Sequence, residues 1–266
     1  MNKKIIKKII SPIVGKKILQ SFFEGLYSFS LLGMNIGSEG DPNKSGEKYA
    51  ADYVENKLKQ FDNVTVFDVG ANVGNYSLLL KKVFGNKAKI YSFEPSKKTF
   101  EKLQANIGSA DGINLYNFGF GDEIAKVNLF SDSNESGLAS IYKRNLTHFK
   151  IDMNRREEIT IRTLDSFCKD NNIGRIHFLK LDVEGHEKKV LDGAQDMLKK
   201  GAIDFIQFEF GGCNIDSKTY FQDFYYLLKS NYKVSRILKD GLRQINEYKE
   251  EYEIFKPTNF LAEIIK

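Results

Sequence analysis

The chain has 266 residues, of which 41% are hydrophobic and 28% charged, so its composition is ordinary for a globular protein with one sizeable core. Its net charge of +5 is too modest to indicate a nucleic-acid partner, and two cysteines are too few for a disulfide scaffold or a zinc site. From the low cysteine count we expect reduced thiols and a cytoplasmic location. We also expect no membrane-spanning helix, because no run of about 18 apolar residues occurs.

Residues 1–44 are expected to form a helical N-terminal extension. In the first 19 residues lysines alternate with isoleucines, and the first acid is Glu24. On a helix the early lysines would occupy one side and the isoleucines the other. Two interpretations stay open: the segment caps the domain with its lysines in solvent, or residues 1–19 make weak peripheral contact with the anionic inner face of a membrane. The apolar stretch 22–32 indicates that part of the extension is buried.

A turn-rich linker, residues 37–46, is followed by a domain that we expect to span residues 45–266. The domain begins with a helix at 47–60, and an apolar strand at 64–69 follows it. This strand runs into a turn of mostly small residues: Gly70, Ala71, Asn72, Val73 and Gly74. Glycines at such a turn let a ligand lie against the backbone where the next helix begins.

Two acids flank this turn in the predicted fold. Asp68 lies just before it, and Glu94 follows the second strand, residues 88–93, directly ahead of Pro95. An acid at the end of the second strand is placed to bind a ribose diol, whereas Asp68 would repel a pyrophosphate and suit an ammonium group. The turn also lacks the third glycine of a dinucleotide site. The pattern favours S-adenosylmethionine over NAD, and the plain alternative is an ordinary strand-turn-helix.

The rest of the chain predicts an α/β fold with a mostly parallel sheet and helices on both faces. Helices are expected at 75–83, 97–107, 187–200 and 219–229, and further strands at 113–118, 176–181, 203–208, 232–238 and 260–265. Short strands at 126–130 and 159–163 enclose the polar stretch 131–158. We predict that this stretch is a mobile substrate lid, since a loop of this length in a compact domain is usually functional or disordered.

The motif Asp182-Val-Glu184-Gly-His186 is the expected chemical centre. It follows a predicted strand, so its acids should gather at the carboxyl edge of the sheet, where desolvation and mutual repulsion cost free energy. Methyl transfer to a hydroxyl requires a group that accepts the hydroxyl proton, and His186, Glu184 or Asp182 could supply it. The alternative for His186 is that it merely opens the following helix.

Glu209 ends the strand predicted at 203–208 and is expected to face the same cleft. Together with Asp182 and Glu184 it would offer three carboxylates to a hard cation such as Mg²⁺. The sequence does not demand a divalent metal, and we favour a reaction without one.

Five ordered motifs resemble successive blocks of the FkbM-type methyltransferase family: VFDVGANVG at 66–74, YSFEP at 91–95, RTLDSF at 162–167, LKLDVEGHE at 179–187 and VLDGA at 190–194. The resemblance covers roughly residues 60–213. It implies a Rossmann-like class I methyltransferase fold with a mostly parallel seven-stranded sheet and S-adenosylmethionine as cofactor. It also implies O-methylation of a sugar or glycan hydroxyl, as in polysaccharide biosynthesis.

The resemblance also assigns site residues. It implies cofactor contacts for the turn that begins at Gly70, for Glu94 with Pro95, and for Asp182. It places Gly121 and Asp122 beside the adenine, although Asp122 could equally be only a turn acid. Methylation of a nitrogen or of a secondary metabolite remains an alternative. The rivals of another class are an NAD-dependent oxidoreductase and a non-catalytic binding protein.

Overall fold

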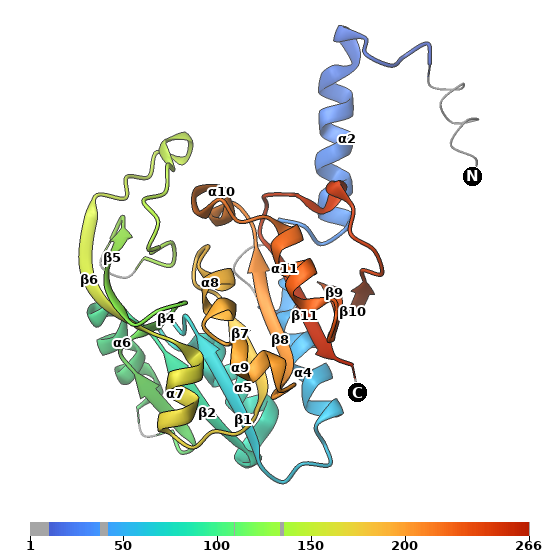
Figure 1. The fold of residues 1–266 in the computed structure, drawn as a ribbon. Coiled ribbons are helices and arrows are strands. Elements are labelled where there is room, and N and C mark those ends of the chain that lie inside the picture. Colours follow the sequence, from blue (N-terminus) through green and yellow to red (C-terminus); the bar gives the residue numbers. More distant parts are fainter. Residues whose placement is uncertain (1–10, 38–41, 109, 134–135, 266) are drawn as a thin grey trace.

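An eight-stranded sheet forms the centre of the molecule (Figure 1). The computed structural model describes residues 11–37, 42–108, 110–133 and 136–265. The strand order is β10-β9-β11-β8-β7-β1-β2-β3. The five strands β8, β7, β1, β2 and β3 are parallel to one another. Strand β11 runs antiparallel to its neighbours β8 and β9, and β10 runs antiparallel to β9. The strands are β1 (Val64–Val69), β2 (Ala88–Phe93), β3 (Ile113–Tyr116), β7 (Ile176–Leu181), β8 (Ile203–Phe210), β9 (Tyr232–Leu238), β10 (Gly241–Gln244) and β11 (Thr258–Ile264).

The predicted Rossmann-like class I arrangement is confirmed, but the expected number of strands is wrong by one. The eighth strand, β10, is a four-residue edge strand that pairs only with β9 among the described strands. Its sequence, Gly-Leu-Arg-Gln, is too short and too polar to show the alternation of a half-buried strand. It folds as a strand because a tight turn after β9 brings its backbone alongside.

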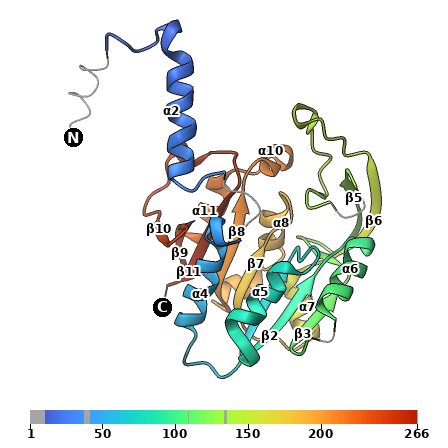
Figure 2. The same cartoon turned by 180° about the vertical axis from the view of Figure 1, so that it is seen from behind.

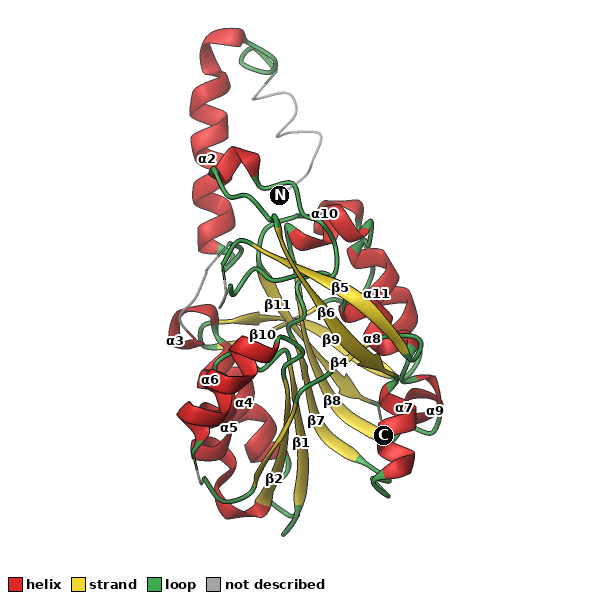
Figure 3. Cartoon of the chain, turned by 90° about the vertical axis from the view of Figure 1, so that its left-hand side faces the viewer, coloured by secondary structure: helices red, strands yellow, loops and turns green. Residues whose placement is uncertain are grey.

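Helices cover both faces of the sheet (Figure 3). One face carries α4 (Glu47–Lys57), α5 (Asn75–Phe84) and α6 (Lys97–Ile107); the other carries α7 (Leu164–Asp170), α8 (Glu187–Asp192), α9 (Gln195–Lys199) and α11 (Phe221–Leu228). The remaining helices in the described ranges are α2 (Gln20–Gly33), α3 (Pro42–Ser45), α10 (Cys213–Ser217) and 3₁₀ turns at Lys17–Leu19, Gly85–Lys87, Thr147–Phe149 and Glu250–Tyr252. The single helix predicted at 187–200 is wrong: it is divided at Gly193, where a Cβ would lie 2.0 Å from the Gly121 carbonyl oxygen.

The core lies on both faces of the central strands, whose side chains are buried in nearly continuous runs, as parallel sheets require. On the α7 face, the rings of Phe67, Phe93 and Phe167 pack with centroids 5.1–5.8 Å apart. On the opposite face, α4 and α5 bury Val54 and Leu80 against the sheet. This two-sided burial holds the carboxyl ends of β1, β2 and β7 in fixed positions.

A small sheet with the order β4-β6-β5 lies beside the carboxyl edge of the large one. It consists of β4 (Gly119–Phe120), β5 (Ala125–Ser131) and β6 (Arg155–Arg162). The two predicted short strands are present and longer than expected, because β5 and β6 pair antiparallel over seven residues each. The stretch between them, predicted as a lid at 131–158, is therefore shortened to residues 132–154.

Helix α2 projects away from the domain (Figures 1 and 2). Of the apolar stretch 22–32, only Leu31 is buried, while Phe22, Phe29 and Leu32 are 64–72% exposed. Residues 11–18 are also exposed, and residues 1–10 lie outside the described part of the chain. Among the described residues, no helix combines the length and the apolar character needed to cross a bilayer.

Candidate active site

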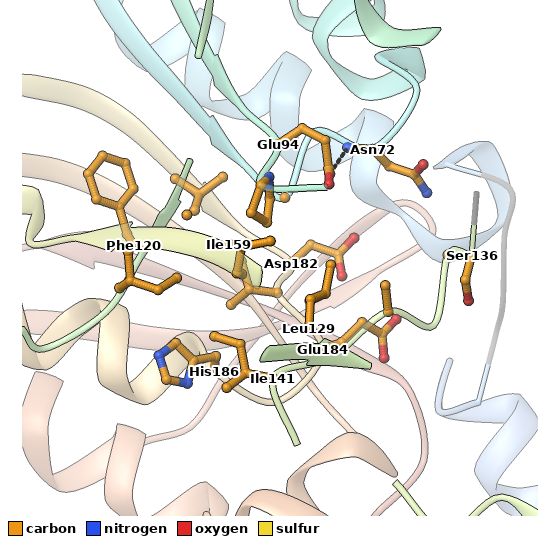
Figure 4. Close-up of a pocket in the computed structure, with 18 residues that line it drawn as sticks. Asn72, Glu94, Phe120, Leu129, Ser136, Ile141, Ile159, Asp182, Glu184 and His186 are labelled. Atoms are coloured by element: carbon orange, nitrogen blue, oxygen red, sulfur yellow. Dashed lines mark hydrogen bonds between the residues drawn. The ribbon is translucent and has the colours of Figure 1, made fainter. Parts of the chain in front are cut away.

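A cavity lies at the carboxyl ends of β1, β2 and β7 and is closed on one side by the small sheet (Figure 4). Leu129, Ile159 and Ile161 form its apolar wall. Seven residues singled out in the sequence line it: Gly70, Asn72, Glu94, Pro95, Asp182, Glu184 and His186. Six others lie outside its lining: Asp68, Ala71, Gly74, Gly121, Asp122 and Glu209.

Position 70 requires glycine because two backbone segments of the chain approach each other closely there. This requirement is independent of any contact with a ligand. Its backbone has φ +81°, and a Cβ there would lie 1.8 Å from the carbonyl oxygen of Asp182. Gly74 has φ +93° and precedes α5, with its missing Cβ facing Leu103 of α6. The sequence predicted that these glycines let a ligand lie against the backbone. The structure adds a second reason for both glycines, since a side chain at either position would clash with another part of the chain.

Glu94 is held at the mouth of the turn by two backbone amides. Its carboxylate accepts hydrogen bonds from Asn72 N at 3.0 Å and from Ser96 N at 2.9 Å. The side chain is 8% exposed, and burial raises its pKa to about 7 although both amides favour the charged form. Each carboxylate oxygen has a second lone pair, so the group retains capacity to accept from a ligand.

Asp68 lies beneath the cavity and is fully buried. Its carboxylate accepts from Ser77 Oγ at 2.6 Å and lies 3.5 Å from the ammonium of Lys180. Lys180 also binds Asp182 at 3.1 Å. Burial lowers the pKa of Lys180, but the charges of Asp182, Asp68 and Glu47 outweigh burial and raise it above its usual range. Lys180 thus places a protein cation beside Asp68, and the contact of Asp68 with an ammonium ligand stays a proposal.

Asp182, Glu184 and Glu209 converge as predicted, with one oxygen of each within 4.8 Å of the others. Burial, followed by the charge of Asp182, raises the pKa of Glu184 to about 8, against the effect of Arg144. Burial and the same neighbouring acid also raise the pKa of Glu209 well above its usual range. Glu184 adopts the left-handed conformation, with φ +51°, which is costly for a residue with a side chain and recurs at functional sites.

A segment of the candidate lid binds this acidic motif through three residues that were not predicted from the sequence. Ser140 Oγ donates to the Glu184 carbonyl at 2.7 Å, and Arg144 Nη1 donates to the Glu184 carboxylate at 2.5 Å. Tyr142 Oη lies 3.0 Å from Nδ1 of His186. These three residues are spaced by two, the chain bends at residues 141 and 142 between them, and all three side chains contact this motif. That spacing is the one sequence signal available for them.

His186 lines the cavity but is turned away from the carboxylates of Asp182 and Glu184 (Figure 4). Its ring lies against Tyr142 and beside Gly121, where a Cβ would come within 2.9 Å of Nε2. Burial lowers the pKa of His186 to about 4. The imidazole is therefore neutral at physiological pH and weakly basic.

Asp122 points to Lys189 of α8, whose ammonium lies 2.6 Å from its carboxylate. This hydrogen bond lowers the pKa of Asp122. Gly121 contacts His186 and Ile161 instead of opening onto the cavity. The contact of these two residues with an adenine stays a proposal.

Residues 68–234 match the family model described as the methyltransferase FkbM domain. Methyltransferase 1 of Beauveria bassiana is 27% identical over 150 residues, which are 51% of this chain and 60% of that protein. Hexuronic acid methyltransferase AglP of Haloferax volcanii is 27% identical over 144 residues, 53% of each protein. The 2-O-methyltransferase NoeI of Sinorhizobium fredii is 23% identical over 145 residues, 51% of this chain and 59% of that protein. The matches thus span between half and two thirds of these relatives.

Replacement of Lys180 by methionine should destabilise the fold, because Asp68 would keep a buried charge without its cation. We expect Lys180→Met to lower the free energy of unfolding by about 3–5 kcal/mol in urea denaturation. The double variant Asp68→Asn/Lys180→Met should recover part of this loss. Equal losses in the single and double variants would contradict the role of the ion pair.

Proposed function

The chain belongs to the FkbM methyltransferase family, and we propose that it transfers a methyl group from S-adenosylmethionine to a hydroxyl of a sugar or glycan-type acceptor. The observation that carries this proposal is the cavity that joins Glu94 to Asp182 and Glu184 at one sheet edge. Two relatives support the acceptor class, since they bear the names hexuronic acid methyltransferase and 2-O-methyltransferase. A nitrogen or secondary-metabolite acceptor is the alternative.

The residues present suit this cofactor. Glu94 would accept from the ribose hydroxyls, and Asp182 would face the ammonium of the amino-acid part. Asn72 Oδ1 is buried without a hydrogen-bond partner among the described atoms, which supports a polar ligand at the turn. When bound, the cofactor supplies an electrophilic methyl group. The protein then has to orient the acceptor oxygen and take its proton.

We assign the proton-accepting role to Glu184. Its pKa of about 8 lies near neutral pH, where a general base is most effective. Asp182 lies beside it, and Arg144 orients its carboxylate from the other side. His186 is the alternative base, although its ring contacts Tyr142 and its pKa of about 4 makes it a weak one.

Asp182, Glu184 and Glu209 are also the candidate metal ligands. We propose that they bind no metal ion during the reaction. Lys180 already binds Asp182, and Arg144 already binds Glu184. A divalent cation at this point would lie close to both positive groups and would be repelled by them.

Loss of Glu94 should weaken cofactor binding. We expect Glu94→Ala to raise the dissociation constant of S-adenosylhomocysteine roughly 10- to 150-fold in calorimetry, because a charged hydrogen-bond acceptor is lost. Glu101→Ala, which removes an exposed acid from α6, is the matched control and should leave the affinity unchanged. Tight binding of NAD with no binding of S-adenosylhomocysteine would overturn the assignment.

The pH dependence of the rate should identify the base. A base must be deprotonated, so with Glu184 the rate should rise as the pH increases through about 8. With His186, whose pKa is about 4, the rate should not change in this pH range. Glu184→Gln should lower turnover about 10²- to 10⁴-fold and leave S-adenosylhomocysteine affinity within a few-fold. The alternative outcome is a rate that does not change with pH, together with a loss of turnover of about 10²- to 10⁴-fold in His186→Ala and not in Glu184→Gln. That outcome would assign the role of the base to His186.

We further propose that the N-terminal extension makes weak contact with an anionic membrane face. Its lysines precede any acid in the sequence, and apolar residues of α2, which follows them in the chain, are exposed. Each lysine near such a surface adds about 1 kcal/mol. The exposure of residues 11–18 gives no support to the alternative, in which this segment caps the domain.

Vesicle co-sedimentation tests this contact. The full chain should bind vesicles of anionic phosphatidylglycerol and ignore neutral phosphatidylcholine, and deletion of residues 1–19 should abolish binding. Phe22→Ser/Phe29→Ser should weaken it, because both rings are exposed. The affinity for S-adenosylhomocysteine reports whether each variant is folded. If the deletion instead unfolds the domain, the segment is a structural cap.

A further inference from the structure

Glu187 is a fully buried acid that follows the motif from Asp182 to His186 and takes no part in the proposed methyl transfer. It is the first residue of α8, a position where an acid normally lies in solvent and interacts with the helix dipole. Burial raises the pKa of Glu187 to about 7, although backbone amides around it favour the charged form. A buried carboxyl group costs free energy, so its contacts indicate what it does.

One carboxylate oxygen of Glu187 accepts two hydrogen bonds from the backbone of the motif. Oε1 accepts from Val183 N at 2.9 Å and from Gly185 N at 3.2 Å. The residue between these two amides is Glu184. The second oxygen of Glu187, Oε2, is buried without a hydrogen-bond partner among the described atoms. The side chain therefore reaches back from the helix and binds the backbone on both sides of Glu184 through a single atom.

The backbone conformation of Glu184 depends on such contacts. Glu184 has φ +51° and Gly185 has φ +100°, so two consecutive residues are left-handed. Glycine adopts this conformation without strain. For Glu184, which has a side chain, it costs free energy and persists only where neighbouring groups hold it. The two hydrogen bonds to Glu187 flank Glu184, and Ser140 Oγ donates to the Glu184 carbonyl at 2.7 Å.

We propose that Glu187 is a positioning residue for the base of the reaction. It binds the amides of Val183 and Gly185 and so holds Glu184 in the left-handed conformation, in which the Glu184 side chain lines the cavity (Figure 4). This inference rests on the proposed function, in which Glu184 accepts the proton of the acceptor hydroxyl. Because both amides bind the same oxygen, the role requires the length of the side chain and one acceptor atom, but not a negative charge.

Two substitutions separate length from charge. Glu187→Gln keeps the length and an acceptor oxygen, so turnover should stay within a few-fold of wild type, each protein being measured at its pH of maximal rate. Glu187→Asp keeps the acid but is one methylene shorter, so residues 183–185 should relax and turnover should fall about 10²-fold, as expected for a misplaced catalytic group. In calorimetry both variants should keep the affinity for S-adenosylhomocysteine within a few-fold.

The matched control is Asp204→Ala, which also removes a buried acid. Asp204 lies at the start of β8, at the edge of the sheet opposite the cavity, and binds Arg175. Its loss should lower the melting temperature and leave turnover unchanged.

Amide hydrogen exchange followed by NMR tests the contact without turnover. The amides of Val183 and Gly185 should be protected in the wild-type chain and in Glu187→Gln, and should exchange about 10-fold faster or more in Glu187→Asp. Unchanged protection in Glu187→Asp would overturn the proposal. So would wild-type turnover in Glu187→Asp, a greater loss in Glu187→Gln than in Glu187→Asp, or an equal loss in the Asp204→Ala control.

The exchange measurement also separates this inference from the proposed function. If the two amides respond as expected but Glu184→Gln keeps full turnover, Glu187 holds the motif and Glu184 is not the base. If the amides respond and the wild-type chain neither binds S-adenosylhomocysteine nor methylates a sugar, the contact stands and the proposed methyl transfer fails.

Discussion

The contact between Gly70 and the backbone of Asp182 determines where the groups of the site lie. β1 and β7 are parallel neighbours, and Asp182 N donates to the Val69 carbonyl at 3.0 Å as the two strands end. A side chain at position 70 would separate them, since its Cβ would overlap the Asp182 carbonyl oxygen. The turn that leads to Asn72 and the motif that begins at Asp182 are therefore one unit, and Glu94 joins it through the Asn72 amide.

The concentration of acids at this edge is stable because two cations lie within it. Lys180 lies between Asp68 and Asp182 and attracts both carboxylates, and Arg144 reaches Glu184 from the small-sheet side. Buried charges without such partners would cost several kcal/mol each. The two cations come from different parts of the fold: Lys180 belongs to the rigid sheet, whereas Arg144 belongs to a loop. The charge balance of Glu184 thus depends on the position of that loop.

The sequence predicted those parts of the site that local patterns encode. The strand, the turn at Gly70 and the acid Glu94 follow one another within a single supersecondary unit, and Asp182 and Glu184 follow a buried strand directly. Ser140, Tyr142 and Arg144 could not be predicted, because their partners lie about 40 residues further along the chain and only tertiary folding joins them. The exposure of α2 was equally hidden, since an apolar stretch normally indicates burial.

The two-residue spacing of Ser140, Tyr142 and Arg144 limits how this loop can vary in length. An insertion or deletion of one residue within 140–144 would shift the following side chains along the chain and break the bonds to Glu184 or His186. Residues 132–139 carry no comparable periodic set of contacts to that motif among those described. Length differences between related chains should therefore accumulate before Ser140, and the distance from Ser140 to Arg144 should stay constant.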